Sequence, residues 1–424
     1  MVRKYQVVSG YSHLDLPPER WTLRVPTKWQ DYVPRRVRLA SGNEMVIVED
    51  RPLPMFRQPG ITGKPYIQYG LEPSDYGAGS GSPEQRLREQ DQVGVDAEIM
   101  CTHPYAPVFF AMVASQDGED SMALHTHPVY AGFWRGNRQD EGYKAVIHAY
   151  NEFLIEEYCA ASPDRLIALG VIPDTGVDDA IAEMEYCAGA GLKGVALHRF
   201  PSGKGYPTRE DDRFWQAAVS MARPITFHAH AGRTAFGREG LQLQNWRQPG
   251  DGPRERDPVS LLPRFAGDRP IAPVQMAYAA VFDRFPQLRI YWAGPQAEWV
   301  PYFLCEMDNV DEPDRYWEKS VGGFELARPP SYYLKTHCLW GFMNDPYAVR
   351  MRDDIGVGHL IWGSDFGRAG GRCADPAAVV ERCFAGVLEA ERHRMVAGNI
   401  IDFFHLRDEF IEPGTTAQPT AQAC

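Results

Sequence analysis

Short apolar segments recur along the chain, and many of them precede segments whose apolar residues have helical spacing. Most of the short segments lack alternation between apolar and polar residues, which is typical of parallel strands that are buried on both faces. We expect eight of them to be strands: 5–13, 97–103, 166–172, 194–200, 225–230, 288–294, 331–338 and 359–365.

Helices are predicted between many of these strands. Residues 145–161 and 177–191 carry apolar side chains at a spacing close to 3.6, and residues 211–222 open with acidic side chains that favour a helix N-terminus. Strands that alternate with helices indicate βαβ units and a parallel sheet. Eight candidate strands favour a closed (β/α)8 TIM barrel of the α/β class over an open doubly wound sheet.

Three polar stretches, at about 17–90, 104–143 and 231–270, interrupt this rhythm. They follow the first, second and fifth predicted strands, which in a barrel places them as long loop insertions at the C-terminal face, over the active site. Within the first stretch, residues 36–50 are expected to form a hairpin. We expect one TIM-barrel domain over residues 1–411 and a disordered tail over 412–424.

Composition narrows the class of protein. The 424 residues carry 44 basic and 56 acidic side chains, a net charge of −12, which argues against a nucleic-acid partner. The first residues do not look like a signal peptide, and no long apolar run predicts a membrane span, so a cytoplasmic location is expected. The eight cysteines are scattered without a CxxC pair, which argues against a zinc ribbon and a disulfide framework.

Candidate metal ligands lie at the C-terminal ends of predicted strands. His13 and Asp15 lie two residues apart, as do His228 and His230, and side chains two apart on a strand share a face. Imidazoles and carboxylates are the usual ligands of zinc, iron, manganese and nickel. Asp365 ends another apolar strand, where a buried carboxylate needs a partner or a metal.

Three weaker metal-site candidates also follow predicted strands. His198 and Glu298 are candidate metal ligands, whereas His103 is a candidate for contact with metal or substrate. The alternative for each histidine is a structural residue that is hydrogen-bonded within the fold, and Glu298 can equally pair with an arginine at the rim. No side chain is predicted as a nucleophile.

Four basic side chains are candidates for binding phosphates or a carboxylate of the substrate, although each can equally be a charge at the rim. They are Arg199, Lys204, Arg233 and Arg368.

The number of candidates exceeds what one catalytic zinc needs, which is about three protein ligands and a water. Such a set suits a six-coordinate metal or a pair of metals. Diiron sites that activate oxygen and dinuclear hydrolases both use mixed histidine and carboxylate ligands, and the residues leave both open. A barrel that has lost catalysis and serves in binding is a third interpretation.

Motifs over nearly the whole chain resemble the amidohydrolase superfamily, in its branch of metal-dependent decarboxylases and hydrolases. They include SHLD, GVALHRF, IYWAGPQAEW and LIWGSDFGR. In that superfamily the motif on the first strand, a histidine on the fifth and an aspartate on the eighth bind the metal. The resemblance places these roles on His13, Asp15, His228 and Asp365.

Departures from the family pattern indicate a rebuilt site. The chain has no ligand near Gly294, where many relatives carry one, and reads SDFGR, with Gly367 and Arg368, where many read SDFPH or SDYPH. Its extra histidines, at 103, 198 and 230, make it similar to the TIM-barrel non-haem diiron monooxygenases of platensimycin and platencin biosynthesis.

That resemblance implies two iron ions, O2 as co-substrate, an external electron donor and hydroxylation of a diterpenoid carried as a CoA thioester, in secondary metabolism. The alternative is a mono- or dinuclear hydrolase or a non-oxidative decarboxylase with zinc or manganese. Either enzyme would act on a small molecule and is compatible with a homo-oligomer.

Overall fold

The computed structural model describes most of the chain. The described residues are 2–14, 16–38, 44–48, 51–52, 79, 81–102, 141–204, 206–228, 270–294, 296–309, 326–367, 375–407 and 409–411. Several predictions lie outside them, namely those on Asp15, His103, His230, Arg233, Arg368, residues 104–140 and 231–269 and the tail 412–424.

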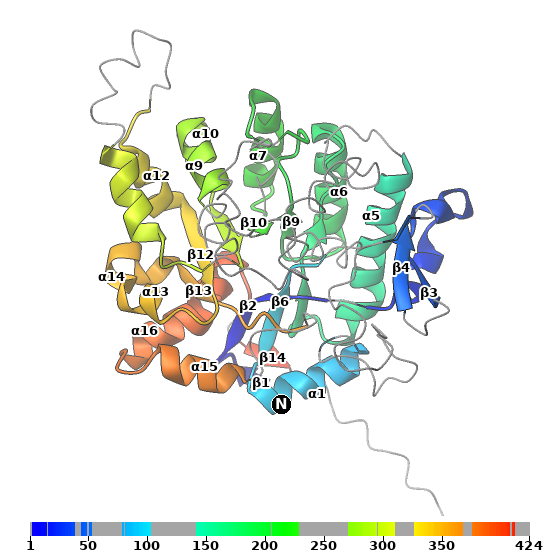
Figure 1. Ribbon diagram of the computed structural model, residues 1–424, viewed down its shortest axis with the longest axis horizontal. Coiled ribbons are helices and arrows are strands. Elements are labelled where there is room, and N and C mark those ends of the chain that lie inside the picture. Colours follow the sequence, from blue (N-terminus) through cyan, green and yellow to red (C-terminus); the bar gives the residue numbers. More distant parts are fainter. Residues whose placement is uncertain are drawn as a thin grey trace, which may run out of the picture.

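Parallel strands form a closed barrel (Figure 1). One sheet has the order β2-β6-β7, and the other runs from β8 to β13 in chain order. A single residue separates β7 from β8, and a parallel bridge from Ser12 to Phe366 joins the first strand to the last. The strands are β2 (Val8–Ser12), β6 (Ala97–Met100), β7 (Leu166–Ala168), β8 (Gly170–Val171), β9 (Val195–Leu197), β10 (Ile225–His228), β11 (Ile290–Ala293), β12 (Cys338–Phe342) and β13 (Leu360–Trp362). The protein is therefore an α/β TIM barrel, as predicted.

Helices surround these strands (Figure 1). In chain order they are α1 (Pro83–Val93), α5 (Glu141–Phe153), α6 (Val177–Gly189), α7 (Asp212–Ser220), α9 (Ile271–Tyr278), α10 (Val281–Arg284), α12 (Pro330–His337), α13 (Pro346–Arg350), α14 (Arg352–Ile355), α15 (Pro376–Cys383), α16 (Glu389–His393) and α17 (Asn399–Phe403). The three predicted helices, at 145–161, 177–191 and 211–222, overlap α5, α6 and α7. Among the described residues, no helix is both long and apolar enough to cross a bilayer.

Smaller elements border the barrel. Strands β3 (Arg35–Arg38), β4 (Glu44–Val48) and β5 (Arg51–Pro52) form an antiparallel sheet beside α5, which confirms the predicted hairpin (Figure 1). Strands β1 (Val2–Lys4) and β14 (Glu409–Ile411) pair antiparallel, so residues near the two ends of the chain lie together.

Side chains alternate between the barrel interior and the helix layer. On β11, Tyr291 and Ala293 pack inside the barrel, whereas Ile290 and Trp292 pack toward the helices. Both sets are buried, which explains why the strands are apolar without alternation. The interior is therefore filled by side chains and is not a pore.

A β-bulge on β2 changes which side chains point inward. Val8 pairs with Ala97 and Ser9 with Glu98, but Ser12 pairs with Met100, so β2 carries one extra residue. Val8 and Tyr11 both pack in the interior although they are three positions apart, which strict alternation forbids. The extra residue therefore turns Tyr11 inward, and a bulge of this kind re-aims side chains beside functional sites.

Two predictions on secondary structure need correction. Residues 331–338, predicted as a strand, belong almost entirely to helix α12, and strand β12 begins at Cys338. Pro330 occupies the first turn of α12, a position that suits proline, and the buried Tyr333, Leu334 and His337 lie on one helical face. Helix α1 begins at Pro83, inside the range 17–90 that was predicted as a loop insertion, and ends beyond that range at Val93.

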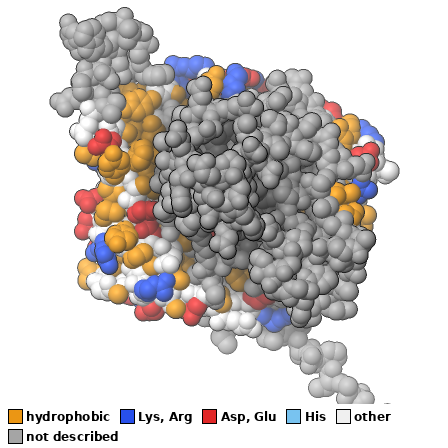
Figure 2. Space-filling model, viewed as in Figure 1, with side chains coloured by type: hydrophobic (Ala, Val, Ile, Leu, Met, Phe, Trp, Pro, Cys, Tyr) orange, Lys and Arg blue, Asp and Glu red, His pale blue; other side chains and the backbone are white. Residues whose placement is uncertain are grey.

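The described surface mixes charges of both signs. Figure 2 shows acidic and basic side chains interspersed around the grey region, with apolar side chains gathered on the side where α12, α13 and α14 lie. The six cysteines among the described residues are all free thiols.

Candidate metal site

The first and last strands of the barrel bring a histidine and an aspartate into contact. Nε2 of His13 lies 3.0 Å from Oδ1 of Asp365, and the two residues are 2% and 1% exposed. His13 directly follows β2, and Asp365 follows β13, so both lie at the C-terminal rim of the barrel. This is the rim where TIM-barrel enzymes carry their active sites.

Backbone hydrogen bonds fasten the two segments together. The His13 N–H donates to the Phe366 carbonyl at 2.7 Å, and the Asp365 N–H donates to the Tyr11 carbonyl at 3.0 Å. Asp365 has a φ of +56°, a left-handed conformation that costs a non-glycine residue roughly 1 kcal/mol or more. The surrounding structure therefore stabilises a backbone conformation that aims the carboxylate at His13.

Two serines, Ser9 and Ser364, also link β2 to the segment after β13. The hydroxyls of Ser9 and Ser364 lie 2.9 Å apart, and the Ser364 N–H also donates to the Ser9 hydroxyl. Both serines are fully buried between β2 and the segment after β13. A buried hydroxyl is costly without a hydrogen-bond partner, so this pair favours one register at the closure of the barrel.

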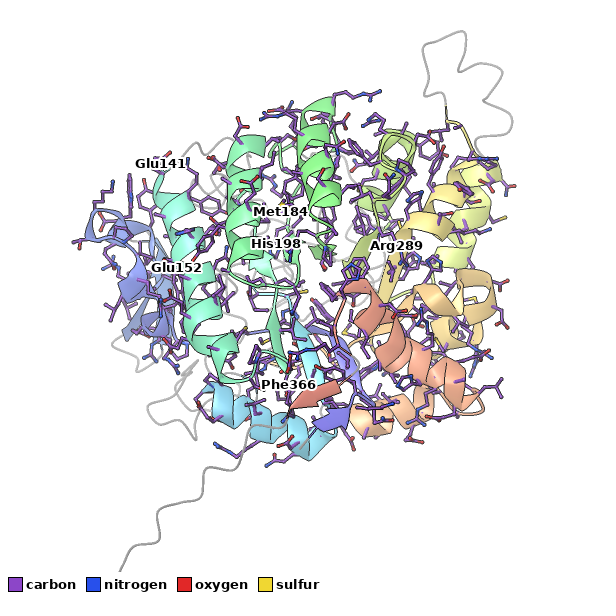
Figure 3. The ribbon with its side chains drawn as sticks, turned by 180° about the vertical axis from the view of Figure 1, so that it is seen from behind. Glu141, Glu152, Met184, His198, Arg289 and Phe366 are labelled. Carbon is purple, nitrogen blue, oxygen red and sulfur yellow. The ribbon has the colours of Figure 1, made fainter. Side chains whose placement is uncertain are left out.

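His198 lies next to β9, at the same rim, and Figure 3 shows it inside the ring of helices. The residue is partly exposed, but both ring nitrogens are enclosed. Burial lowers the pKa of His198 to about 4, the Thr102 backbone raises it and the charge of His13 lowers it further. The ring is therefore a neutral imidazole at physiological pH, the form that binds metals.

Other predicted ligands are placed only in part. His228 is the last residue of β10, beside Ala293 of β11, so its backbone lies at the rim, and its side chain is not described. Glu298 is half-buried on the turn that follows β11. Among the residues that the structure describes, no three histidine, cysteine, aspartate or glutamate side chains gather closely enough to hold a metal.

Asp345 fixes the backbone around Glu298 and was not predicted. Its Oδ2 accepts hydrogen bonds from the N–H groups of Ala297 and Glu298 at 2.8 and 3.1 Å, and its Oδ1 accepts from Ala348 at 2.9 Å. The same carboxylate thus caps α13 and holds the turn after β11. The incorrect prediction of a strand at 331–338 hid Asp345, which lies three residues beyond the true strand β12.

A second acidic residue at the rim, Asp174, was also missed. Its Oδ2 lies 3.5 Å from Nη1 of Arg199, and burial raises the pKa of Asp174 while the arginine lowers it. The pKa of Arg199 is lowered by burial. Asp174 follows β8 as Asp365 follows β13, so the same pattern of an acid after an apolar strand would have found it.

The predicted substrate contacts differ in their surroundings. Arg199 is 9% exposed and faces Asp174. Lys204 is exposed, and its ammonium group lies 3.2 Å from Glu210. Arg199 is thus a buried cation paired within the fold, whereas Lys204 makes an ion pair at the surface.

The chemistry of these donors fits a divalent cation. A buried carboxylate in contact with a histidine, and a neutral imidazole at the same rim, are oxygen and nitrogen donors of the kinds that manganese, zinc and iron accept. Two of the residues expected to complete the set, Asp15 and His230, lie outside the described residues.

Solved structures with the same fold cover nearly the whole chain. An amidohydrolase from Mycobacterium avium subsp. paratuberculosis matches with a TM-score of 0.64 and 16% identity, over 94% of this chain and 99% of its own. The 5-carboxyvanillate decarboxylase LigW from Sphingomonas paucimobilis matches with a TM-score of 0.58 and 16% identity, over 95% and 100%.

A third structure was determined with a metal. The dihydroxybenzoic acid decarboxylase from Polaromonas sp. JS666, solved with bound manganese and the inhibitor 2-nitroresorcinol, matches with a TM-score of 0.54 and 15% identity, over 95% of this chain and 97% of its own. At such low identity the three likenesses show the fold alone. None of the three is named as a monooxygenase, so these matches do not show the expected resemblance to a diiron monooxygenase.

A family model with the description "Amidohydrolase" matches residues 125–406. This range contains β7 to β13, and with them His198, His228, Glu298 and Asp365. It covers well over half of the chain and agrees with the motifs and with the barrel. The chain belongs to the amidohydrolase family.

Proposed function

We propose that the protein is a metal-dependent decarboxylase that removes CO2 from a small aromatic carboxylate without a redox step. The observation that carries the proposal is the buried contact between His13 and Asp365 at the rim of the barrel. The decarboxylases with this fold act on 5-carboxyvanillate and on dihydroxybenzoates, according to their names, which supplies the substrate class.

We assign the metal to His13, Asp365 and His198, together with Asp15 and His228 from the sequence motif, and Glu298 and His230 as further candidates. Manganese is the favoured ion, because two of the similar decarboxylase structures contain it. When bound, such an ion supplies a Lewis acid that polarises oxygen atoms of the substrate.

The protein's own residues would orient the substrate and keep the site dry. Arg199 is the favoured partner for a substrate carboxylate that remains in the product, because it is a buried cation at the rim. Arg233, Arg368, Lys204 and His103 remain weaker candidates from the sequence. In the reaction the C–C bond to the carboxylate breaks, CO2 leaves and a proton takes its place, so no electron donor is needed.

The test combines metal analysis with an anaerobic assay. Protein purified without chelator is expected to contain close to one manganese or zinc per chain, and to release CO2 from a panel of ortho-hydroxybenzoates without oxygen. Dialysis against a chelator should abolish the release, and added Mn²⁺ should restore it. Protein that carries no stoichiometric metal would contradict the proposal.

The same experiment distinguishes the proposed decarboxylase from the diiron monooxygenase that was predicted from the sequence. About two irons per chain, with oxygen uptake and an external electron donor, would instead support the diiron monooxygenase and its CoA-linked diterpenoid substrate. Hydrolysis of an amide or ester in the absence of CO2 release would favour the hydrolase. The cytoplasmic location and the homo-oligomer stay predictions from sequence.

A further inference from the structure

A buried ion pair lies directly behind the closure of the barrel. Arg86 on α1 and Glu98 on β6 are 0% and 1% exposed at their side chains. The guanidinium binds the carboxylate through two bonds, from Nε to Oε1 at 2.5 Å and from Nη2 to Oε2 at 2.8 Å. The Gln90 amide donates to the same Oε1. Such a fork-to-fork pair holds the guanidinium plane in one orientation.

The guanidinium packs against the segment that carries Asp365. Its carbon lies 5.2 Å from the centre of the Phe366 ring, within the range of a cation–π contact. Figure 3 shows Phe366 close to α1. Phe366 directly follows Asp365, and its carbonyl accepts the hydrogen bond from the His13 N–H.

The third guanidinium nitrogen of Arg86, Nη1, lies against Gly79 and Gly367. Nη1 donates to the Gly79 carbonyl at 2.7 Å. A methyl group on Gly79 would lie 2.5 Å from Cα of Gly367, and one on Gly367 would lie 2.8 Å from Nη1 and 2.2 Å from the His13 carbonyl. Arg86, Gly79 and Gly367 are therefore packed in direct contact behind His13, with no room for a side chain.

We infer that Arg86 is a positioning residue for the metal site: its guanidinium, fixed by Glu98, holds the 365–367 segment against His13. The inference rests on the proposed function, because it assumes that His13 and Asp365 bind a metal. Arg86 touches neither side chain and acts through the Phe366 ring and the Gly367 backbone. Partners of this kind that orient metal ligands typically change metal affinity by about 10- to 100-fold when they are removed.

The test is Mn²⁺ affinity of the chelator-treated full chain, read from the electron paramagnetic resonance signal of free Mn²⁺, with thermal unfolding in parallel. Arg86→Met is expected to weaken binding about tenfold or more. Phe366→Leu keeps the ion pair and removes only the ring, and is expected to weaken binding a few-fold.

Arg165→Met is the matched control. Arg165 is also a buried arginine, and it binds Asp91 at 2.7 Å and the Asp96 carbonyl at 2.8 Å, away from Phe366. The Arg165→Met substitution should lower the melting temperature and leave the Mn²⁺ affinity within twofold of that of the wild type.

The outcomes are distinguishable. If the wild type binds no Mn²⁺, Zn²⁺ or Fe²⁺, the proposed function fails and the inference fails with it. If the wild type binds Mn²⁺ and Arg86→Met binds it as tightly, or loses no more than Arg165→Met, the role of Arg86 is structural only. If Arg86→Met does not fold, Phe366→Leu decides, and unchanged affinity in that variant overturns the inference.

Discussion

Nε2 of His13 lies 3.0 Å from Oδ1 of Asp365, although 352 positions of the chain separate the two residues. The contact exists because β2 and the segment after β13 meet at the closure of the barrel. A carboxylate buried this deeply needs compensation from a hydrogen-bond partner or a cation. The histidine and the carboxylate of the candidate site therefore meet at the place where the first and last strands close the barrel.

Two substitutions of Asp365 should affect metal binding equally but the free energy of unfolding differently. Asp365→Ala and Asp365→Gly both remove the carboxylate, so both are expected to lose bound metal, measured by elemental analysis. Because φ at this position is +56°, the glycine variant should be more stable than the alanine variant, by about 1 kcal/mol in urea unfolding. Metal content equal to that of the wild type would remove Asp365 from the site.

Gly367 should not tolerate a methyl group. Its φ is +79° and a Cβ would lie 2.2 Å from the His13 carbonyl, so Gly367→Ala carries both backbone strain and a clash. Gly386 has a φ of +80° with open space around it, so Gly386→Ala carries the strain alone. We expect Gly367→Ala to lose at least about 2 kcal/mol more than Gly386→Ala in urea unfolding. Equal losses would show that the segment after β13 moves aside freely.

Asp345 should contribute more than an ordinary helix cap. Asp345 and Asp375 each cap a helix that begins with proline, and each accepts one N–H within that helix. Asp345 is buried and also accepts the N–H groups of Ala297 and Glu298. Asp375→Ala should cost about 1 kcal/mol. Asp345→Ala should cost about 3 kcal/mol or more, because two further N–H groups lose their acceptor. Similar free energies of unfolding for the two variants would contradict this.

A surface histidine predicts a pH dependence of stability. Nδ1 of His148 on α5 lies 3.0 Å from Oε2 of Glu183 on α6, and this hydrogen bond raises the pKa of His148, with a further contribution from Glu152. A pKa raised in the folded state stabilises the fold fully below the unfolded value of about 6.5 and loses its effect as pH rises through the folded value.

The measurement compares melting temperatures of the wild type and His148→Gln. The wild type is expected to exceed the variant most near pH 5.5 to 6, below the unfolded pKa, and the difference should shrink toward pH 9. A difference that is constant over this range would mean that the Tyr186 ring, whose centre lies 4.2 Å from that of His148, and not the charge, stabilises the α5–α6 contact.

The barrel could be predicted because its strands are buried on both faces and therefore remain apolar over their whole length. The segment SYYLKTHC was misread because tyrosine and threonine favour strands, whereas Pro330 and the buried face of Tyr333, Leu334 and His337 make it a helix. The true strand, CLWGF, was obscured by Gly341, which lies in close contact with the backbone of Trp292. Tertiary packing decided both cases.

The sequence allowed us to predict which residues belong to the candidate site, but not which of them are in contact. Acidic and imidazole side chains after apolar strands pointed to His13, His198 and Asp365, which the structure places at one rim. The buried pair of Arg86 and Glu98 had no signal in the sequence, because an arginine on an amphipathic helix usually faces solvent. Its partner comes from a different element, and only the packing of α1 on β6 brings the two together.

The extra residue in β2 decides which side chains of this strand face the barrel interior. The number of positions between Val8 and His13 therefore matters as well as the residue types. Deleting Gly10 would remove no side chain and yet is expected to turn the His13 imidazole toward the helix layer. Related chains can therefore be sorted by this count: those that keep the additional position keep the side chain at the His13 position facing inward, and those that lack it turn this side chain toward the helices.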